Sequence, residues 1–159
     1  MPTIERIQLI RRPLDEVFAF FADAKNLEAI TPPYLHFRIL TPLPIDMRAG
    51  TLIDYHLRLF GVSMKWKTRI EAFDAPLRFV DRQLKGPYKL WHHLHEFYEV
   101  EGGVLMVDRV DYQIGWSIFG GLAHAAFVRR TLDDIFDYRR FKVAELLDAP
   151  TSEPMLAKA

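Results

Sequence analysis

GPYKLWHHLHEFYEVEGGVLMVDRVDYQIGW, residues 86–116, predicts two long antiparallel strands joined by a tight turn at residues 101–103. Alternate residues of a strand share a face, so each strand should turn one set of side chains inward: Trp91, His93, His95 and Phe97, then Asp108, Val110 and Tyr112. Such a face is too apolar for a solvated surface and too polar for an ordinary core. We therefore expect it to form the wall of an internal cavity.

The same two-residue period extends toward the N-terminus. It predicts strands over residues 3–10, 35–41, 51–60, 64–73 and 77–85, and Ile7 and Leu9 share one face of the first strand. Two short helices are expected over residues 14–24 and 26–30, each bounded by proline. The first half of the chain thus predicts a strand, two helices and a run of strands.

After Trp116 the apolar period changes to that of a helix. Between residues 121 and 147 the apolar residues recur at spacings of three, four and seven: Val128, Leu132, Ile135, Phe136, Val143, Leu146 and Leu147. The predicted helix is about 39 Å long at 1.5 Å per residue, enough to cross a whole sheet. Residues 150–159 are expected to form a flexible tail.

These elements predict an α+β fold with a curved antiparallel sheet of about seven strands. The long C-terminal helix is the element that can cover the concave face of the sheet, with the two short helices beside it. This arrangement is a helix-grip fold that encloses a cavity. We expect residues 1–149 to form one such domain.

The composition narrows the class of protein. The 21 basic and 21 acidic side chains balance, so the basic excess of a nucleic-acid-binding protein is missing from the sequence. The sequence has no cysteine, which excludes disulfides, cysteine nucleophiles and thiolate metal sites and is compatible with the cytoplasm. We expect a cytoplasmic monomer or homodimer without stable membrane insertion.

Several local motifs lie at the expected strand and helix positions: Phe79-Val80-Asp81, Gly86-Pro87-Tyr88, Trp91-x-His93-x-His95-x-Phe97, Gly102-Gly103, Asp108-Arg109-Val110-x-Tyr112 and Ile135-Phe136-x-Tyr138-Arg139. With these motifs the sequence resembles the SRPBCC or START-like superfamily, which includes StAR-related lipid-transfer domains, birch-pollen-type allergens and bacterial polyketide cyclases and dehydrases. Within it, the motifs look like a bacterial branch whose members occur alone or beside an epimerase-like domain described as a cell-division inhibitor. No such second domain is expected here, so that role is not carried over. The resemblance implies a helix-grip fold and a hydrophobic ligand.

The expected ligand site combines an apolar lining with a few polar contacts. The apolar lining is assigned to Tyr55, Trp66, Trp91, Phe97 and Tyr112, closed by Phe127 and Ile135 of the helix, and the polar contacts to Asp81, Gln83, His93, His95 and Asp108. Each aromatic residue has ordinary core packing as its alternative. Asp81 and Gln83 point into the cavity only if Val80, Arg82 and Leu84, which lie on the other face of the same strand, point away from it.

Arg139 lies on or near the buried stripe of the long helix and is also assigned to the site. It has two interpretations. One is an ion pair with a buried acid such as Asp108 or with an anionic ligand. The other, which we favour from the sequence, is an arginine whose side chain reaches out to solvent.

His93 and His95 are the candidate chemical groups, since an H-x-H pair on a strand places two imidazoles about 6 to 7 Å apart on one face. With Asp108 they suggest a metal site, but a further ligand is not evident, and histidines that bond buried carboxylates are the alternative. We expect no metal and no cofactor. His93, His95 and Asp108 could also act as acid and base in a cyclisation or dehydration.

The expected function is the binding of a small or medium hydrophobic molecule, such as a lipid, polyketide or aromatic compound, by a carrier or sensor. A cyclase or dehydratase is the alternative, and an interaction module with a filled core is a third possibility.

Overall fold

The computed structural model describes residues 1–59, 61–115 and 121–148, with the side chains of residues 121 and 122 left aside. The elements follow the expected order: β1 (Thr3–Ile10), α1 (Leu14–Ala22), α2 (Lys25–Ala29), the 3-10 turn η1 (Pro33–Leu35), β2 (Arg38–Ile39), β3 (Leu52–Leu59), β4 (Val62–Asp74), β5 (Arg78–Lys85), β6 (Tyr88–Val100), β7 (Gly103–Ile114) and α3 (Gly121–Leu147). The expected tail at residues 150–159 lies outside the described residues. Among the described residues, no helix combines the length and the apolar character needed to cross a membrane.

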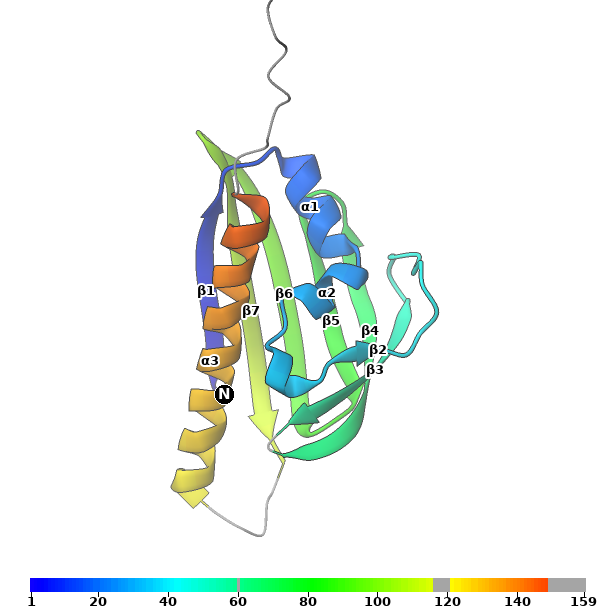
Figure 1. Cartoon of the computed structure of the whole chain (residues 1–159), viewed down its shortest axis with the longest axis vertical. Helices are drawn as coiled ribbons and strands as arrows, with labels where there is room; N and C mark the ends of the chain where they lie inside the picture. The colour runs from blue at the N-terminus through cyan, green and yellow to red at the C-terminus, as the bar shows by residue number, and fades with distance from the viewer. Residues whose placement is uncertain (60, 116–120, 149–159) are drawn as a thin grey trace, which may run out of the picture.

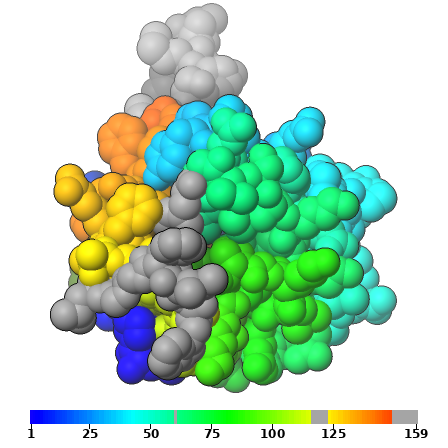
Figure 2. Space-filling view, turned by 90° about the horizontal axis from the view of Figure 1, so that it is seen from below, coloured from blue at the N-terminus to red at the C-terminus, as the bar shows by residue number. Residues whose placement is uncertain are grey.

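The described strands form one seven-stranded antiparallel sheet in the order β1-β7-β6-β5-β4-β3-β2. Consecutive strands from β2 to β7 are neighbours, and β1 closes the other edge beside β7. The sheet curves, and α1, α2 and α3 lie against the same face (Figure 1). Seen from below, the N-terminal residues, the start of α3 and the β3–β4 and β5–β6 turns surround one end of the molecule (Figure 2). The predicted α+β helix-grip fold is confirmed.

The central hairpin has the predicted alternation. Trp91 is paired with Tyr112, and His95 with Asp108, so these residues share the concave face. The turn lies at residues 101 and 102, with φ of +87° at Gly102, a value that favours glycine. At Gly103 a Cβ atom would overlap the carbonyl oxygen of Ile10, so glycine also lets β1 approach the hairpin end.

One strand differs from the sequence expectation. The expected strand at residues 35–41 is reduced to Arg38 and Ile39, because residues 33–35 form a 3-10 turn and His36 adopts a left-handed conformation with φ of +45°. In β1, Ile7 and Leu9 do share a face, but that face is exposed. The inward face of β1 carries Arg6 and Gln8, which bond to α3.

Buried apolar residues form two clusters. The cavity-side cluster comprises Ile4, Ala24, Leu35, Ile53, Tyr55, Leu57, Leu59, Trp66, Ile70, Tyr88, Trp91, Val110, Tyr112, Val128, Leu132 and Phe136. The packed cluster comprises Ile10, Val17, Phe18, Phe21, Ile30, Phe79, Phe97, Val104, Met106 and Val143. On α3 the buried stripe is Val128, Leu132, Phe136, Arg139 and Val143, whereas Leu146 is exposed, contrary to its place in the predicted stripe.

Candidate functional site

A cavity of about 160 Å³ lies between the concave face of the sheet and the helices. The strands β3, β4, β5 and β6 supply its wall, and α1, α2 and α3 supply its cover. Side chains therefore leave an open space between the sheet and the helices. This observation counts against an interaction module with a solid core.

Most of the expected site residues line this cavity: Tyr55, Trp66, Asp81, Trp91, His93, His95, Ile135 and Arg139. On β5 it is therefore Asp81 that faces inward.

The remaining expected residues lie elsewhere. Gln83 bonds the backbone of Tyr88, and Phe97 packs in the packed cluster. Tyr112 is buried in the cavity-side cluster, and the Phe127 side chain is 55% exposed on α3. Asp108 lies behind the two histidines, beside a second, very small pocket that Arg139 also lines.

Sequence reasoning missed several lining residues: Phe21, Ala24 and Leu27 of the short helices, Leu35 of η1, Ile53, Leu57 and Leu59 of β3, Thr68 of β4, and Tyr88 at the start of β6. The alternation of β3 was a usable signal, because Ile53, Leu57 and Leu59 share the face of Tyr55. The helical residues carried no comparable signal. Their position depends on how α1 and α2 pack over the sheet.

An aromatic group forms one part of the cavity wall. Trp66 meets Trp91 edge to face at 5.2 Å between ring centroids, and Tyr88 lies 4.8 Å from Trp91. Trp66 Nε1 donates to the Thr68 hydroxyl at 3.1 Å. The Tyr88 hydroxyl is buried and has no hydrogen-bond partner within the described ranges, so it is available to a ligand.

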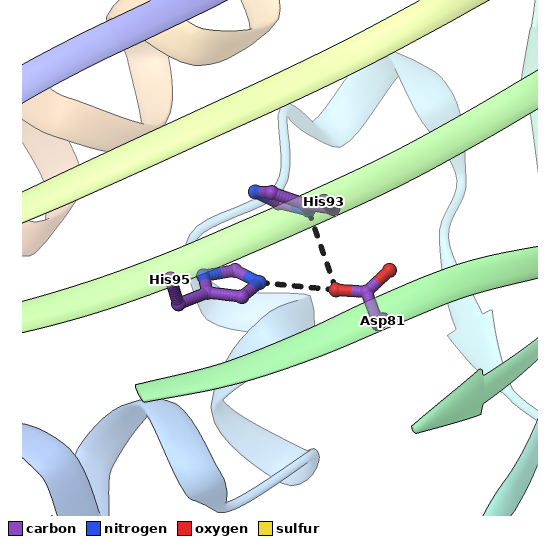
Figure 3. A group of neighbouring side chains, drawn as sticks. All are labelled: Asp81, His93 and His95. Carbon is purple, nitrogen blue, oxygen red and sulfur yellow. Dashed lines mark hydrogen bonds and ion pairs between the residues drawn. The ribbon is translucent and has the colours of Figure 1, made fainter. Parts of the chain in front are cut away.

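Five polar side chains meet at the cavity and form what we call the polar cluster. His93, His95, Asp108 and Arg139 are buried, and Asp81 is half-buried. Asp81 Oδ2 lies 3.0 Å from His95 Nε2 and 3.4 Å from His93 Nδ1, so one carboxylate oxygen of β5 faces two rings of β6 (Figure 3).

Asp108 lies on the other side of the same rings. Its Oδ1 atom hydrogen-bonds His93 Nε2 and lies 3.5 Å from His95 Nδ1. Arg139 Nε is 2.8 Å from Asp108 Oδ2. Because Arg139 is buried and forms this ion pair, the sequence interpretation of a solvent-reaching arginine was wrong and the paired one is confirmed.

The electrostatics favour ionised carboxylates and a neutral His95. Burial acts to raise the pKa of Asp108, but Arg139 and His93 outweigh it and hold that pKa well below its usual range. Burial also acts to raise the pKa of Asp81, which His93 and His95 nevertheless lower. Burial and the neighbouring His93 lower the pKa of His95 to about 4.

Aromatic contacts hold the polar cluster between the two apolar clusters. The His95 ring stacks on Phe79 at 4.1 Å, and His93 meets Phe136 at 5.5 Å. The Arg139 guanidinium lies 5.8 Å from the centre of the Phe21 ring. Among the described residues, Asp81, His93 and His95 also offer donor atoms that all lie within 4.8 Å of one another.

No protein-family model and no curated protein matches the sequence. Solved structures do. A protein from Chromobacterium violaceum superposes with a TM-score of 0.71 and 14% identity over 93% of this chain and 98% of that one. Ara h 8.0201 superposes with a TM-score of 0.60 and 15% identity over 91% of this chain and 98% of that one.

The nucleoside-diphosphate sugar epimerase from Corynebacterium glutamicum superposes with a TM-score of 0.65 and 23% identity, over 91% of this chain but 29% of that one. At such identities the likeness concerns the fold alone. Together with the sheet order and the covering helix, it identifies the fold of this chain as the START-like, Bet v 1-like helix-grip fold.

Proposed function

We propose that this protein binds a small hydrophobic molecule in its cavity and acts as a carrier or sensor of that molecule. The observation that carries the proposal is a cavity of about 160 Å³ with a mostly aromatic and aliphatic wall and one polar end. Ligand sites in proteins combine these two features. The START-like fold of the chain is consistent with this function.

The size of the cavity restricts the ligand. An engineered apolar cavity of about 150 Å³ in another protein accepts benzene, so the present cavity suits a molecule of one or two rings. A long acyl chain or a polyketide would require the cover to open. The aromatic compounds named from the sequence therefore fit better than the lipids.

The polar end restricts the orientation of the ligand. The buried Tyr88 hydroxyl lacks a partner in the described part of the chain, and His93, His95 and Arg139 line the same cavity. A ring with one hydroxyl or carboxylate suits this lining, because its oxygen can bond either the Tyr88 hydroxyl or the polar side chains while the ring packs against Trp66 and Trp91. Phenol, benzoate and 2-naphthol are suitable probes.

Two measurements test the binding. Native mass spectrometry of freshly purified protein should reveal a co-purified compound, and titration with the three probes should shift the melting temperature and change the tryptophan fluorescence. Leu57→Phe, which adds a ring to the cavity wall, should abolish binding. Leu52→Phe is the matched control, because Leu52 is on the same strand and 48% exposed. Equal binding by both variants would contradict the proposal, and so would the absence of any ligand or response in the wild type.

Proton transfer to the bound molecule, as in a cyclisation or dehydration, is the second candidate function. It is favoured by the position of His93 and His95, which line the cavity and contact the buried Asp108 carboxylate and the half-buried Asp81 carboxylate. His93→Gln and His95→Gln should abolish turnover of an identified ligand, whereas its packing against Trp66 and Trp91 should keep measurable binding in both variants. Unchanged turnover in both variants would exclude this candidate.

The bacterial branch named from the sequence is also retained as a proposal. It rests on the local motifs of the sequence, such as Trp91-x-His93-x-His95-x-Phe97, and the superposition on part of the Corynebacterium glutamicum epimerase shows a shared fold. The activity named for that larger protein is not assigned to this chain.

A further inference from the structure

We propose that Asp81, His93 and His95 form a binding site for one divalent transition-metal ion, of the class that includes zinc and iron(II). The ligand atoms would be Asp81 Oδ2, His93 Nδ1 and His95 Nε2. The sequence had suggested Asp108 as the carboxylate ligand. This inference goes beyond the binding of a hydrophobic molecule and does not depend on it.

The distances between the donor atoms fit a metal ion. Asp81 Oδ2 lies 3.0 Å from His95 Nε2 and 3.4 Å from His93 Nδ1, and all three atoms are within 4.8 Å of one another. Zinc bonds nitrogen and carboxylate oxygen at about 2.0 to 2.2 Å, which separates neighbouring ligand atoms of a tetrahedral site by about 3.3 Å. Both carboxylate–imidazole distances therefore lie close to the spacing of a tetrahedral metal site.

The strands hold these donors rigidly. Asp81 lies directly opposite His93 in the β5–β6 pairing, and His95 follows two residues later on the same face. Phe79 stacks on the His95 ring, which limits its rotation. The donor set is thus fixed by strand register and aromatic packing, the kind of support that a metal site requires.

The hydrogen bonds of His95 are incomplete in the absence of a metal. A neutral imidazole has one N–H and one lone pair. Because Nε2 must donate its proton to Asp81, Nδ1 turns its lone pair toward Asp108 Oδ1 at 3.5 Å, and it is buried without a hydrogen-bond partner among the described residues.

A metal ion removes this mismatch. With Nε2 bound to the metal, the proton of His95 moves to Nδ1, which can then donate to Asp108. His93 already directs Nε2 toward Asp108 and leaves Nδ1 for the metal. Asp108 would then accept from both ligands, with Arg139 anchoring it at 2.8 Å. A carboxylate that accepts from the second nitrogen of a ligating histidine is a common feature of zinc sites.

The charge balance also calls for a cation. Among the described residues of the polar cluster, two carboxylates face one guanidinium, which leaves a net negative charge when both histidines are neutral. A buried uncompensated charge is costly. A metal ion bound to these residues would neutralise it.

The ligand types indicate the metal class. Two imidazoles and one carboxylate suit zinc and iron(II) better than magnesium or calcium, which prefer oxygen ligands. Three protein ligands also leave a coordination position open, as in catalytic sites. Because all three residues line the cavity, that position would face the space in which a ligand binds.

The test uses the full chain without a polyhistidine tag, stripped with a chelator and then titrated with Co²⁺ and Zn²⁺. We expect one equivalent of metal per chain by elemental analysis, a visible Co²⁺ absorption band typical of nitrogen and oxygen ligands, and loss of that band when Zn²⁺ is added. X-ray absorption of the zinc form should show two imidazoles. These measurements need no variant.

Variants then locate the site. Asp81→Asn and His95→Gln should weaken Co²⁺ binding at least tenfold, and Asp108→Asn should weaken it about 10- to 100-fold, as for other groups that hold metal-bound histidines. His92→Gln is the matched control, because His92 is on the same strand but points to the opposite, exposed face, 3.7 Å from Glu71. Circular dichroism checks that each variant is folded.

The proposal is overturned by either of two results. One is a folded wild-type protein that binds no Co²⁺ or Zn²⁺. The other is binding that His92→Gln abolishes and His95→Gln does not, which would place an adventitious ion on the outer face of the sheet.

Discussion

The packed cluster and the cavity-side cluster are both rich in aromatic residues, yet their packing differs. In the packed cluster Phe18 meets Phe73, Phe79 and Phe97 edge to face at 5.5, 6.0 and 5.4 Å, so the rings interlock beneath α1. The side chains of the cavity-side cluster supply most of the lining of the cavity of about 160 Å³, which Phe21, Ile30 and Phe79 of the packed cluster also border. The first cluster stabilises the end of the sheet near the β6–β7 turn, and the second leaves room for a ligand.

The polar cluster lies where these two regions meet. His95 stacks on Phe79 of the packed cluster, whereas His93 meets Phe136 of the cavity-side cluster. A dense hydrophobic region on one side restricts the rings, and an open space on the other makes them accessible. The contrast between the two clusters therefore explains how the polar side chains can be both rigid and available.

The largest effect on stability is expected from Arg139→Leu. It leaves the buried Asp108 carboxylate without its cation, and breaking a buried ion pair in this way costs about 3 to 5 kcal/mol. Urea denaturation monitored by circular dichroism measures the change in unfolding free energy. Arg130→Leu, at an exposed position of the same helix, is the control and should stay within about 0.5 kcal/mol. Similar losses of unfolding free energy in both variants would mean that the ion pair of the polar cluster does not stabilise the fold.

The next largest effect on stability is expected when a methionine of the packed cluster is shortened to alanine, in comparison with a methionine that borders the cavity. Met106 is buried in the packed cluster, so Met106→Ala should cost about 2 to 5 kcal/mol because it opens a new void. Met47 borders the existing cavity and is only half-buried, so Met47→Ala should cost about 1 kcal/mol or less. Equal losses in urea denaturation would show that the two regions are packed to the same density.

The fold could be predicted from the sequence to a large extent, because strand and helix periods determine it locally. The alternation from Trp91 to Phe97 and the helical stripe from Val128 to Val143 both have the expected burial. The face of β1 could not be read in this way. Its apolar Ile7 and Leu9 are exposed, because Arg6 and Gln8 make the contacts with α3.

The site was harder to predict, because it depends on contacts between distant elements. The inward direction of His93 and His95 follows from the strand period, but the choice of Asp81 as their partner depends on the β5–β6 register. The pairing of Arg139 with Asp108 brings α3 onto β7, and the sequence offered it as one of two alternatives. Periodicity predicts which face a residue occupies, whereas partners across the fold require the three-dimensional structure.

A third prediction adds volume instead of removing it. Val104 is fully buried in the packed cluster, so Val104→Phe should cost about 1 to 3 kcal/mol by overpacking. Leu57→Phe adds a ring on the cavity wall and should change stability by less than about 1 kcal/mol, because the ring can occupy open space. The two melting curves measure this difference. A large loss for Leu57→Phe would indicate that the cavity wall cannot accommodate a ring.

The smallest effect on stability is expected from Arg6→Gln. This variant removes a solvent-exposed ion pair, for comparison with the buried Arg139–Asp108 pair. Arg6 contacts Asp137 at 2.6 Å and Asp133 at 2.9 Å, distances close to the 2.8 Å of the Arg139–Asp108 pair. The Asp137 side chain, however, is 62% exposed. Solvent therefore screens the pair, and its loss should cost about 1 kcal/mol or less.

Salt distinguishes the two pairs further. Raising the salt concentration to about 1 M shortens the screening length to about 3 Å, which should remove most of the difference between wild type and Arg6→Gln. The loss caused by Arg139→Leu should persist, because buried pairs are screened much less. If salt reduced both losses equally, solvent would reach the polar cluster freely. His93 and His95 would then lie in an open cleft, and the apolar clusters around them would not explain their restricted positions.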